Sequence, residues 1–82
     1  MKAVLQTRQR RDRMHIIADI VGITIGGSLK PQVMYRANLS FTQVNEYLPF
    51  LLQVKLVTST TTNGKRVYKA TSKGTRFLRH HA

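Results

Sequence analysis

Polar side chains able to recognise base edges cluster in one short segment, SFTQVNEYLPFLLQ at residues 40–53. The amides of Gln43 and Asn45 can each make paired hydrogen bonds to adenine. Thr42 can contact a thymine methyl group or a phosphate, and Glu46 can accept a hydrogen bond from the amino group of cytosine. An ion pair between Glu46 and a nearby basic side chain is the alternative interpretation. These residue types at this spacing predict a surface that contacts nucleic-acid bases.

The net charge favours a polyanionic partner. Fourteen lysines and arginines against three acidic residues give +11 over 82 residues, more than solubility alone requires. Most basic residues lie in two blocks, 2–13 and 65–79, on either side of a nearly neutral centre. Phosphate contacts are expected from Arg11, Arg13, Arg36, Ser40, Lys65, Arg66 and Lys69. For Arg36, capping of helix carbonyl groups is the alternative.

Several kinds of chemistry have no support in the sequence. There is no cysteine, which excludes a disulfide framework and a thiolate zinc site. His80 and His81 are adjacent and lack the spacing of metal ligands. The glycines within 22–27 lack the spacing of a phosphate-binding loop, and there are no paired carboxylates. We therefore expect no enzymatic activity, no cofactor or metal, and no small-molecule substrate.

No segment has the character of a membrane span. The longest apolar stretch, residues 16–25, is short and contains Asp19 and Gly22. The first eleven residues lack the apolar run of a secretory signal. We expect no membrane partner and a cytoplasmic, nucleoid-associated location.

Two helices are predicted before the polar segment. The first, over residues 11–21, has an apolar stripe at helical spacing formed by Met14, Ile17, Ala18 and Val21, with Asp12 in its first turn. The second begins at Pro31 and ends at Asn38, a residue that tolerates the left-handed conformation. Leu39 is expected to insert into the core.

The polar segment itself is predicted to be a third helix, 40–53. Ser40 and Gln43 have the spacing of a capping box, in which each side chain bonds to the other residue's backbone N–H. The expected buried stripe is Val44, Tyr47, Leu48, Leu51 and Leu52.

A β-hairpin is predicted after the third helix. Asn63-Gly64 between two β-branched runs is typical of a two-residue turn, and it pairs Thr60 with Val67, Ser59 with Tyr68 and Val57 with Ala70. A short final helix capped by Thr71 follows, with Phe77 and Leu78 facing inward. Gly74 is expected to weaken this helix by about 1 kcal/mol relative to alanine.

This order of elements predicts an α+β, mainly helical fold. Three helices and a β-hairpin wing form a winged helix-turn-helix, with a short C-terminal helix. The chain divides into a basic arm or helix extension at 1–10, a winged helix domain at 11–79 and a tail at 80–82. In such a fold, helix 40–53 enters the major groove and the wing, 58–69, lies along the backbone or minor groove.

Two stretches carry a family resemblance: VMYRANLSFTQVNEYLPFLLQVKLV and YKATSKGTRFL. Their pattern is similar to that of archaeal winged helix-turn-helix regulators and of small basic archaeal chromosomal proteins with the same domain, over residues 11–78. The resemblance implies binding to double-stranded DNA, usually as a homodimer. The chain departs from the pattern at Pro49, at Lys55 where the family has glycine, and after Leu78, where the chromosomal proteins continue into a dimerising coiled coil. The first helix and the N-terminal arm are therefore the expected dimer elements.

Pro49 lies inside the third helix, where proline costs about 3 kcal/mol. One hypothesis is that Pro49 bends or ends the helix behind the base-reading residues. The alternative is a tolerated substitution without a role.

Three functions are consistent with the sequence. The first is a sequence-specific DNA-binding regulator such as a repressor, favoured by the mixed polar face of the third helix. The second is an architectural protein that coats DNA with little sequence preference, favoured by the charge and small size. The third is a winged helix used for protein contacts in a transcription assembly. RNA is disfavoured because no exposed aromatic platform is expected.

Overall fold

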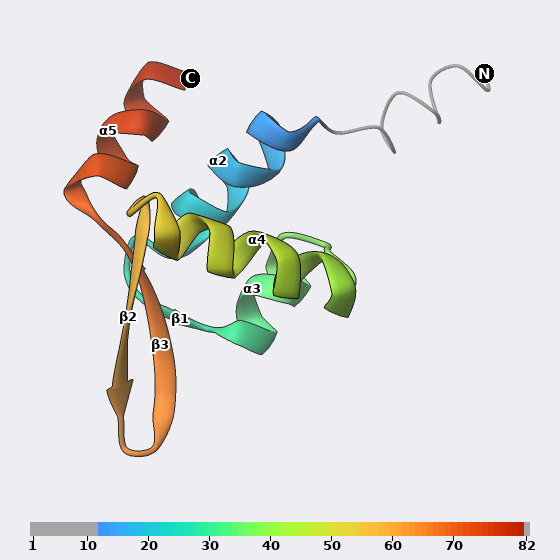
Figure 1. The fold of residues 1–82 in the computed structure, drawn as a ribbon, viewed down its shortest axis with the longest axis vertical. Helices are drawn as coiled ribbons and strands as arrows, with labels where there is room; N and C mark the ends of the chain where they lie inside the picture. Colours follow the sequence, from blue (N-terminus) through green and yellow to red (C-terminus); the bar gives the residue numbers. More distant parts are fainter. Residues whose placement is uncertain (1–11, 82) are drawn as a thin grey trace.

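The computed structural model describes residues 12–81, which form four helices and a three-stranded antiparallel sheet (Figure 1). In chain order the elements are α2 (Arg13–Ile23), β1 (Ser28–Leu29), α3 (Lys30–Arg36), α4 (Phe41–Gln53), β2 (Val57–Thr62), β3 (Lys65–Ala70) and α5 (Ser72–His81). The helices gather around one core, and the β2–β3 hairpin projects away from them (Figure 1). The predicted α+β fold of helices, hairpin wing and C-terminal helix is confirmed.

Helix α2 is shifted along the chain from the predicted range of 11–21. Asp12 is its N-cap rather than a first-turn residue, and the carboxylate accepts a hydrogen bond from the backbone N–H of His15 at 2.8 Å. The placement of Met14 on the buried stripe is wrong: this side chain lies in the first turn, at the edge of the core, and is 49% exposed. The buried residues of the helix are Ile16, Ile17, Ile20 and Val21.

The turn between α3 and α4 is closed by local hydrogen bonds. Asn38 has a φ of 57°, and its N–H donates to the carbonyl of Tyr35 at 3.2 Å. The next N–H, of Leu39, reaches the carbonyl of Met34 at 2.9 Å, which completes a left-handed helix end. The Leu39 side chain is buried in the core, as predicted. Helix α3 begins at Lys30, one residue before the predicted start.

Helix α4 begins with the predicted capping box. The N–H of Gln43 donates to Ser40 Oγ at 3.1 Å, and the N–H of Ser40 donates to Gln43 Oε1 at 2.9 Å. Leu52 was predicted to be buried but is only half-buried, because it lies at the flank of the helix. The buried stripe is Val44, Tyr47, Leu48 and Leu51.

Pro49 does not end α4, because the helix continues to Gln53. That part of the hypothesis was wrong, whereas the bend remains a prediction. Since proline has no N–H, the carbonyl of Asn45 lacks its usual donor one turn later. The core residues Leu48 and Leu51 on either side of the proline hold both parts of the helix against the core.

The end of α4 explains the glycine preference at position 55. Lys55 has a φ of 64°, and its N–H donates to the carbonyl of Leu52 at 3.2 Å. The N–H of Leu56 donates to the carbonyl of Leu51 at 3.0 Å, so the helix ends in the same left-handed motif as α3. Glycine adopts this conformation without steric cost, and lysine does not.

The hairpin has the predicted register. Thr60 pairs with Val67, Ser59 with Tyr68 and Val57 with Ala70, around a turn in which Asn63 and Gly64 have φ angles of 53° and 77°. The short strand β1 adds to the free edge of β3, giving the order β1-β3-β2. At the base of the hairpin, the N–H of Ala70 donates to the carbonyl of Thr24 at 2.9 Å.

Thr71 joins the wing to α5. Its hydroxyl donates to the carbonyl of Lys55 at 2.6 Å and accepts from the N–H of Gly74 at 3.0 Å, which confirms the predicted cap. Gly74 is buried, and a Cβ there would overlap the carbonyl oxygen of Leu56. The helix continues through His80 and His81, which the sequence had placed in a tail. None of the helices within residues 12–81 is both long enough and apolar enough to cross a membrane.

Candidate nucleic-acid interface

The outer face of α4 presents three of the four predicted base-reading residues together. Thr42, Asn45 and Glu46 are exposed, and Thr42 lies three and four positions before the other two, on the side of the helix away from the buried stripe. Within the described residues, Glu46 makes no ion pair, so the alternative interpretation of this side chain is not observed. A hydroxyl, an amide and a carboxylate without an ion-pair partner among residues 12–81 therefore share one surface near the start of the helix.

The fourth predicted residue, Gln43, has a structural task. Its Oε1 accepts the N–H of Ser40 in the capping box, which leaves the Nε2 amino group as the free part of the amide. A spacing of two residues also places Gln43 on a different side of the helix from Asn45. The Ser40 hydroxyl, predicted to contact phosphate, accepts the N–H of Gln43 and keeps its own proton for a further acceptor.

The wing supplies exposed cations next to its turn. Lys65 and Arg66 pair with Thr62 and Thr61 and are exposed. Because side chains alternate along a strand, Arg66 lies on the face of the buried Tyr68, and Lys69 lies on the opposite face. The three predicted wing cations therefore do not all lie on the same face of the hairpin.

A groove between the wing and α3 gathers positive charge. Its volume is about 460 Å³, and its lining residues are Leu29, Lys30, Pro31, Lys65, Arg66 and Tyr68. Lys30 was missed in the sequence, since it lies in the nearly neutral centre of the chain. The pairing of Ser28 with Tyr68 brings it to the wing, and this contact spans 40 residues of sequence. A groove with three cations and no acid is suited to a phosphate group.

Two aromatic rings project from the helix-turn-helix, contrary to the expectation of no exposed aromatic surface. Tyr35 near the end of α3 is 85% exposed, and Phe41 at the first position of α4 is 66% exposed. The ammonium group of Lys30 lies 5.3 Å from the centroid of the Phe41 ring. The charged groove and the start of α4 are therefore parts of one continuous surface.

The remaining predicted phosphate contacts either do not line the groove or lie outside the described residues. The guanidinium of Arg13 lies 5.3 Å from the centroid of the Tyr47 ring, at the start of α2. Arg36 is exposed in the last turn of α3 and caps no carbonyl among residues 12–81. Arg11 and the arm at 1–10 lie outside the described residues.

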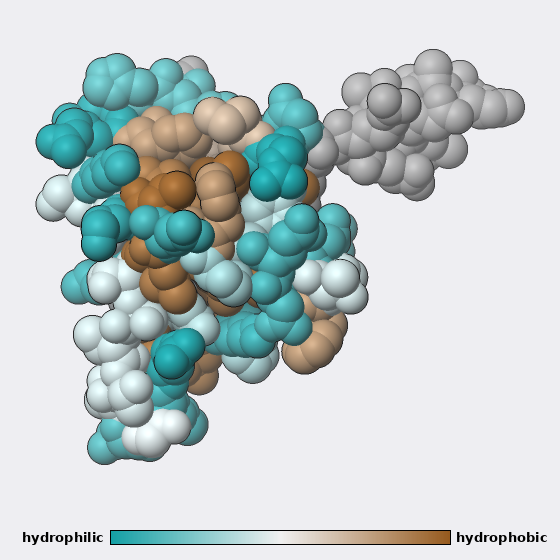
Figure 2. Space-filling model, viewed as in Figure 1, coloured by the Kyte–Doolittle hydropathy of each residue, from teal (hydrophilic) through white to brown (hydrophobic). Residues whose placement is uncertain are grey.

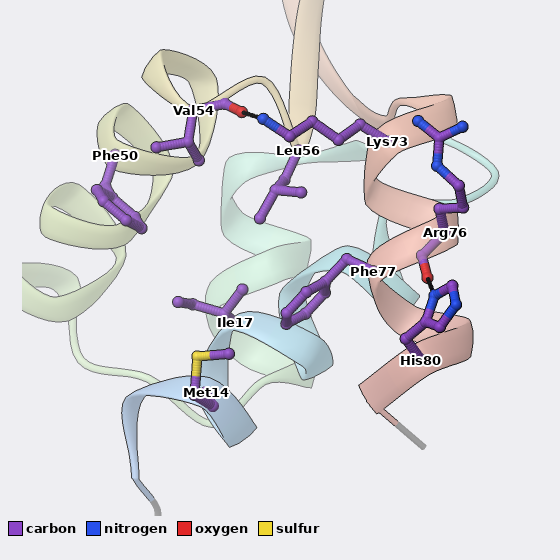
Figure 3. Close-up of a pocket in the computed structure, with 9 residues that line it drawn as sticks. All are labelled: Met14, Ile17, Phe50, Val54, Leu56, Lys73, Arg76, Phe77 and His80. Carbon is purple, nitrogen blue, oxygen red and sulfur yellow. Dashed lines mark hydrogen bonds between the residues drawn. The ribbon is translucent and has the colours of Figure 1, made fainter.

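A second, apolar surface lies between α2, α4 and α5. In Figure 2 the hairpin is covered by hydrophilic and neutral side chains, whereas hydrophobic ones gather between α4 and α5. An open pocket of about 590 Å³ is found here, lined by Met14, Ile17, Phe50, Val54, Leu56, Lys73, Arg76, Phe77 and His80. Figure 3 shows Lys73 extending across it to the carbonyl of Val54, at 2.9 Å, while the polar ends of Arg76 and His80 point away from the apolar side chains.

The fold and the sequence together define the class of this protein. Residues 10–82 match a family model described as winged helix-turn-helix, so the chain belongs to that family. No curated protein sequence matches the chain.

Solved structures that are similar to it include the following two. One is that of Sso10a-2, a DNA-binding protein from Sulfolobus solfataricus, with 27% identity and a TM-score of 0.80 over 85% of this chain and 74% of that one. The other is the apo form of a C30AH42A mutant of ZitR from Lactococcus lactis, with 13% identity and a TM-score of 0.68. This second likeness covers 98% of the present chain but only 62% of ZitR, and it concerns the fold alone.

Proposed function

We propose that this protein binds double-stranded DNA, with α4 in the major groove and the wing along the backbone. The observation that carries the proposal is the cationic groove of Lys30, Lys65 and Arg66, which is continuous with the exposed polar start of α4. Phosphate contacts from such a groove fix the position of a protein on the duplex, and base contacts specify the sequence. The likeness to Sso10a-2, itself a DNA-binding protein, supports the same function. A protein with this function is expected to be cytoplasmic and associated with the nucleoid.

Within this function, the role of a sequence-specific regulator is favoured over that of an architectural coat. Glu46 is exposed on the outer face of α4 and has no cationic partner among the described residues. A free carboxylate repels every phosphate backbone, so it weakens general binding, but it is matched to the amino group of cytosine. The charge of +11 favours the architectural alternative. Use of the domain for protein contacts is the third possibility.

The test is fluorescence anisotropy with labelled duplexes of about 30 base pairs across a salt series. A mixed-sequence duplex is compared with a duplex selected from a random pool for tight binding. Preference for the selected duplex by about a thousandfold or more indicates a regulator. Tight, salt-sensitive binding without this preference indicates an architectural protein. The absence of binding at low salt contradicts both DNA functions and favours the use of the domain for protein contacts.

We also propose that the protein is a homodimer that associates through the apolar pocket between α2, α4 and α5. Phe50 is 39% exposed at the pocket and faces the half-exposed Met14 across it. An open apolar surface of this kind on a small domain is typical of an interaction site. The polar ends of Arg76 and His80 point away from the pocket, so a second copy would cover apolar atoms without burying those groups (Figure 3).

A further inference from the structure

Phe41 is an apolar side chain in a position where a polar one is expected. It is the first residue of α4 and is 66% exposed, while its neighbours on the exposed side, Thr42 and Asn45, are polar. The N-terminal residues of a recognition helix are those that contact base edges. Single exposed hydrophobic residues are common, so exposure alone assigns no role to Phe41.

The neighbourhood of the ring gives the second observation. Lys30 lies over Phe41 at 5.3 Å and at the same time lines the groove that also contains Lys65 and Arg66. A phosphate bound in that groove would lie next to the ring. Phe41 is also one helical turn before Asn45, so the ring and the amide lie along the same side of α4. The contact with Lys30 and the position one turn before Asn45 place the ring beside the proposed DNA-binding surface.

The four bases differ in how well their major-groove edges suit an apolar ring. The edges of guanine, adenine and cytosine present hydrogen-bonding groups, and an apolar ring against them removes water without replacing its hydrogen bonds. The 5-methyl group of thymine is the apolar group in that groove. A phenyl ring therefore gains from contact with thymine and loses at the other bases.

On these grounds, and resting on the proposed DNA binding, we infer that Phe41 reads thymine through its 5-methyl group. The experiment compares two duplexes of identical mixed sequence, one with thymine and one with uracil at every such position, which differ only in the methyl groups. The wild-type protein should bind the thymine duplex about fourfold more tightly, the factor expected from burying one methyl group. For the Phe41→Ala variant, this ratio should fall to about one.

Matched variants separate this contact from its neighbours. Thr42→Ser removes the other methyl group near the start of α4 and measures how much of the ratio comes from Thr42, which is itself a predicted base-reading residue. Tyr35→Ala removes the second exposed ring and is the control that should keep the wild-type ratio. Circular dichroism checks that each variant is folded, which is expected because all three side chains are exposed.

The outcomes are distinct. A wild-type protein that binds both duplexes equally, or a Phe41→Ala variant that keeps the full ratio, overturns the inference while DNA binding stands. Loss of the ratio in Thr42→Ser but not in Phe41→Ala assigns the methyl contact to Thr42 and also overturns it. A wild-type protein that binds neither duplex contradicts the proposed function itself, and the inference with it.

Discussion

At the scale of single residues, left-handed backbone positions lie at the ends of α3 and α4 and in the turn of the hairpin. Within residues 12–81 the non-glycine residues with positive φ are Asn38, Lys55 and Asn63, and each lies in a turn. Asparagine tolerates this region because its side chain can bond locally, whereas lysine has no such compensation. Lys55 is therefore the strained member of the three.

Replacing Lys55 with glycine should stabilise the protein. The change relieves the positive φ of 64°, at the cost of a more flexible unfolded chain, for a net gain of about 0.5–1 kcal/mol. Urea unfolding measures the free energy of unfolding. Lys55→Ala is the control, since it removes the side chain but keeps the strain. A glycine variant no more stable than the alanine variant would contradict this reasoning.

Replacing Gly74 with alanine should destabilise the protein, although alanine is the better helix former. The added Cβ would overlap the backbone carbonyl of Leu56, and relief of such overpacking costs about 1–3 kcal/mol. Gly22→Ala in α2 is the matched control. Its Cβ would meet Leu78 Cδ1 at 3.5 Å, an ordinary contact, so it should gain up to about 1 kcal/mol. A thermal unfolding curve of Gly74→Ala that does not shift to lower temperature would exclude the steric explanation.

Gly74 also shows what sequence reasoning could not predict. The propensity scale identified it only as a weak point in a helix, because a close approach between α5 and the turn after α4 is not visible in the sequence. The same limit applies to Lys30, which β-strand pairing brings to the wing from 35 positions before Lys65. By contrast, the cap of Ser40 and Gln43 depends on residues three positions apart and was predicted correctly.

At the scale of elements, the hairpin was the most predictable part of the fold. A two-residue turn sets the register of both strands, and the alternation of side chains follows from it. The third strand, β1, lies outside the hairpin, and its place beside β3 depends on a distant pairing. The groove between the wing and α3 exists because of that pairing. The sequence could therefore predict that Lys65 and Arg66 contact phosphate, but not that they lie next to Lys30.

Replacing both Lys65 and Arg66 with alanine should weaken binding to all DNA sequences alike. If both side chains contact phosphates, the slope of log affinity against log salt should flatten by about two units. Anisotropy titrations at four or five salt concentrations measure the slope.

A double variant of α5, Arg76→Ala with Arg79→Ala, is the charge-matched control for this experiment. It removes the same charge at the end of the molecule opposite the hairpin tip (Figure 1) and should leave the slope near the wild-type value. An equal flattening in both double variants would mean that net charge, rather than the wing, sets the salt dependence.

At the scale of the whole molecule, polar and apolar surfaces are separated. The cationic groove and the polar face of α4 belong to the helix-turn-helix and the wing, and the apolar pocket belongs to α2, α5 and the far end of α4. A two-fold dimer through the pocket would carry two DNA-binding surfaces. Such dimers recognise half-sites separated by about one helical turn of DNA.

Replacing Met14 and Phe50 together with glutamine should weaken self-association by at least tenfold. Each side chain would no longer bury apolar area in the interface, and burial of one such side chain is worth about 1.5–3 kcal/mol. Sedimentation equilibrium measures the dissociation constant. Ile25→Gln is the control, because Ile25 is 51% exposed but does not line the pocket. A wild-type protein that is monomeric at high concentration would contradict the proposed dimer.

The attachment of the hairpin has a mechanical consequence. Its base is held by the bond from Ala70 to Thr24 and by the bonds of Thr71, and β1 pairs with β3 only as far as Val67. Beyond Val67 the hairpin has no third strand beside it within the described residues. A small rotation at its base therefore becomes a larger displacement at Arg66 and the turn. Amide hydrogens should accordingly exchange slowly at the base and quickly at the tip. If the wing lies along the DNA backbone as proposed, its tip could follow duplexes of different groove width while the core keeps its packing.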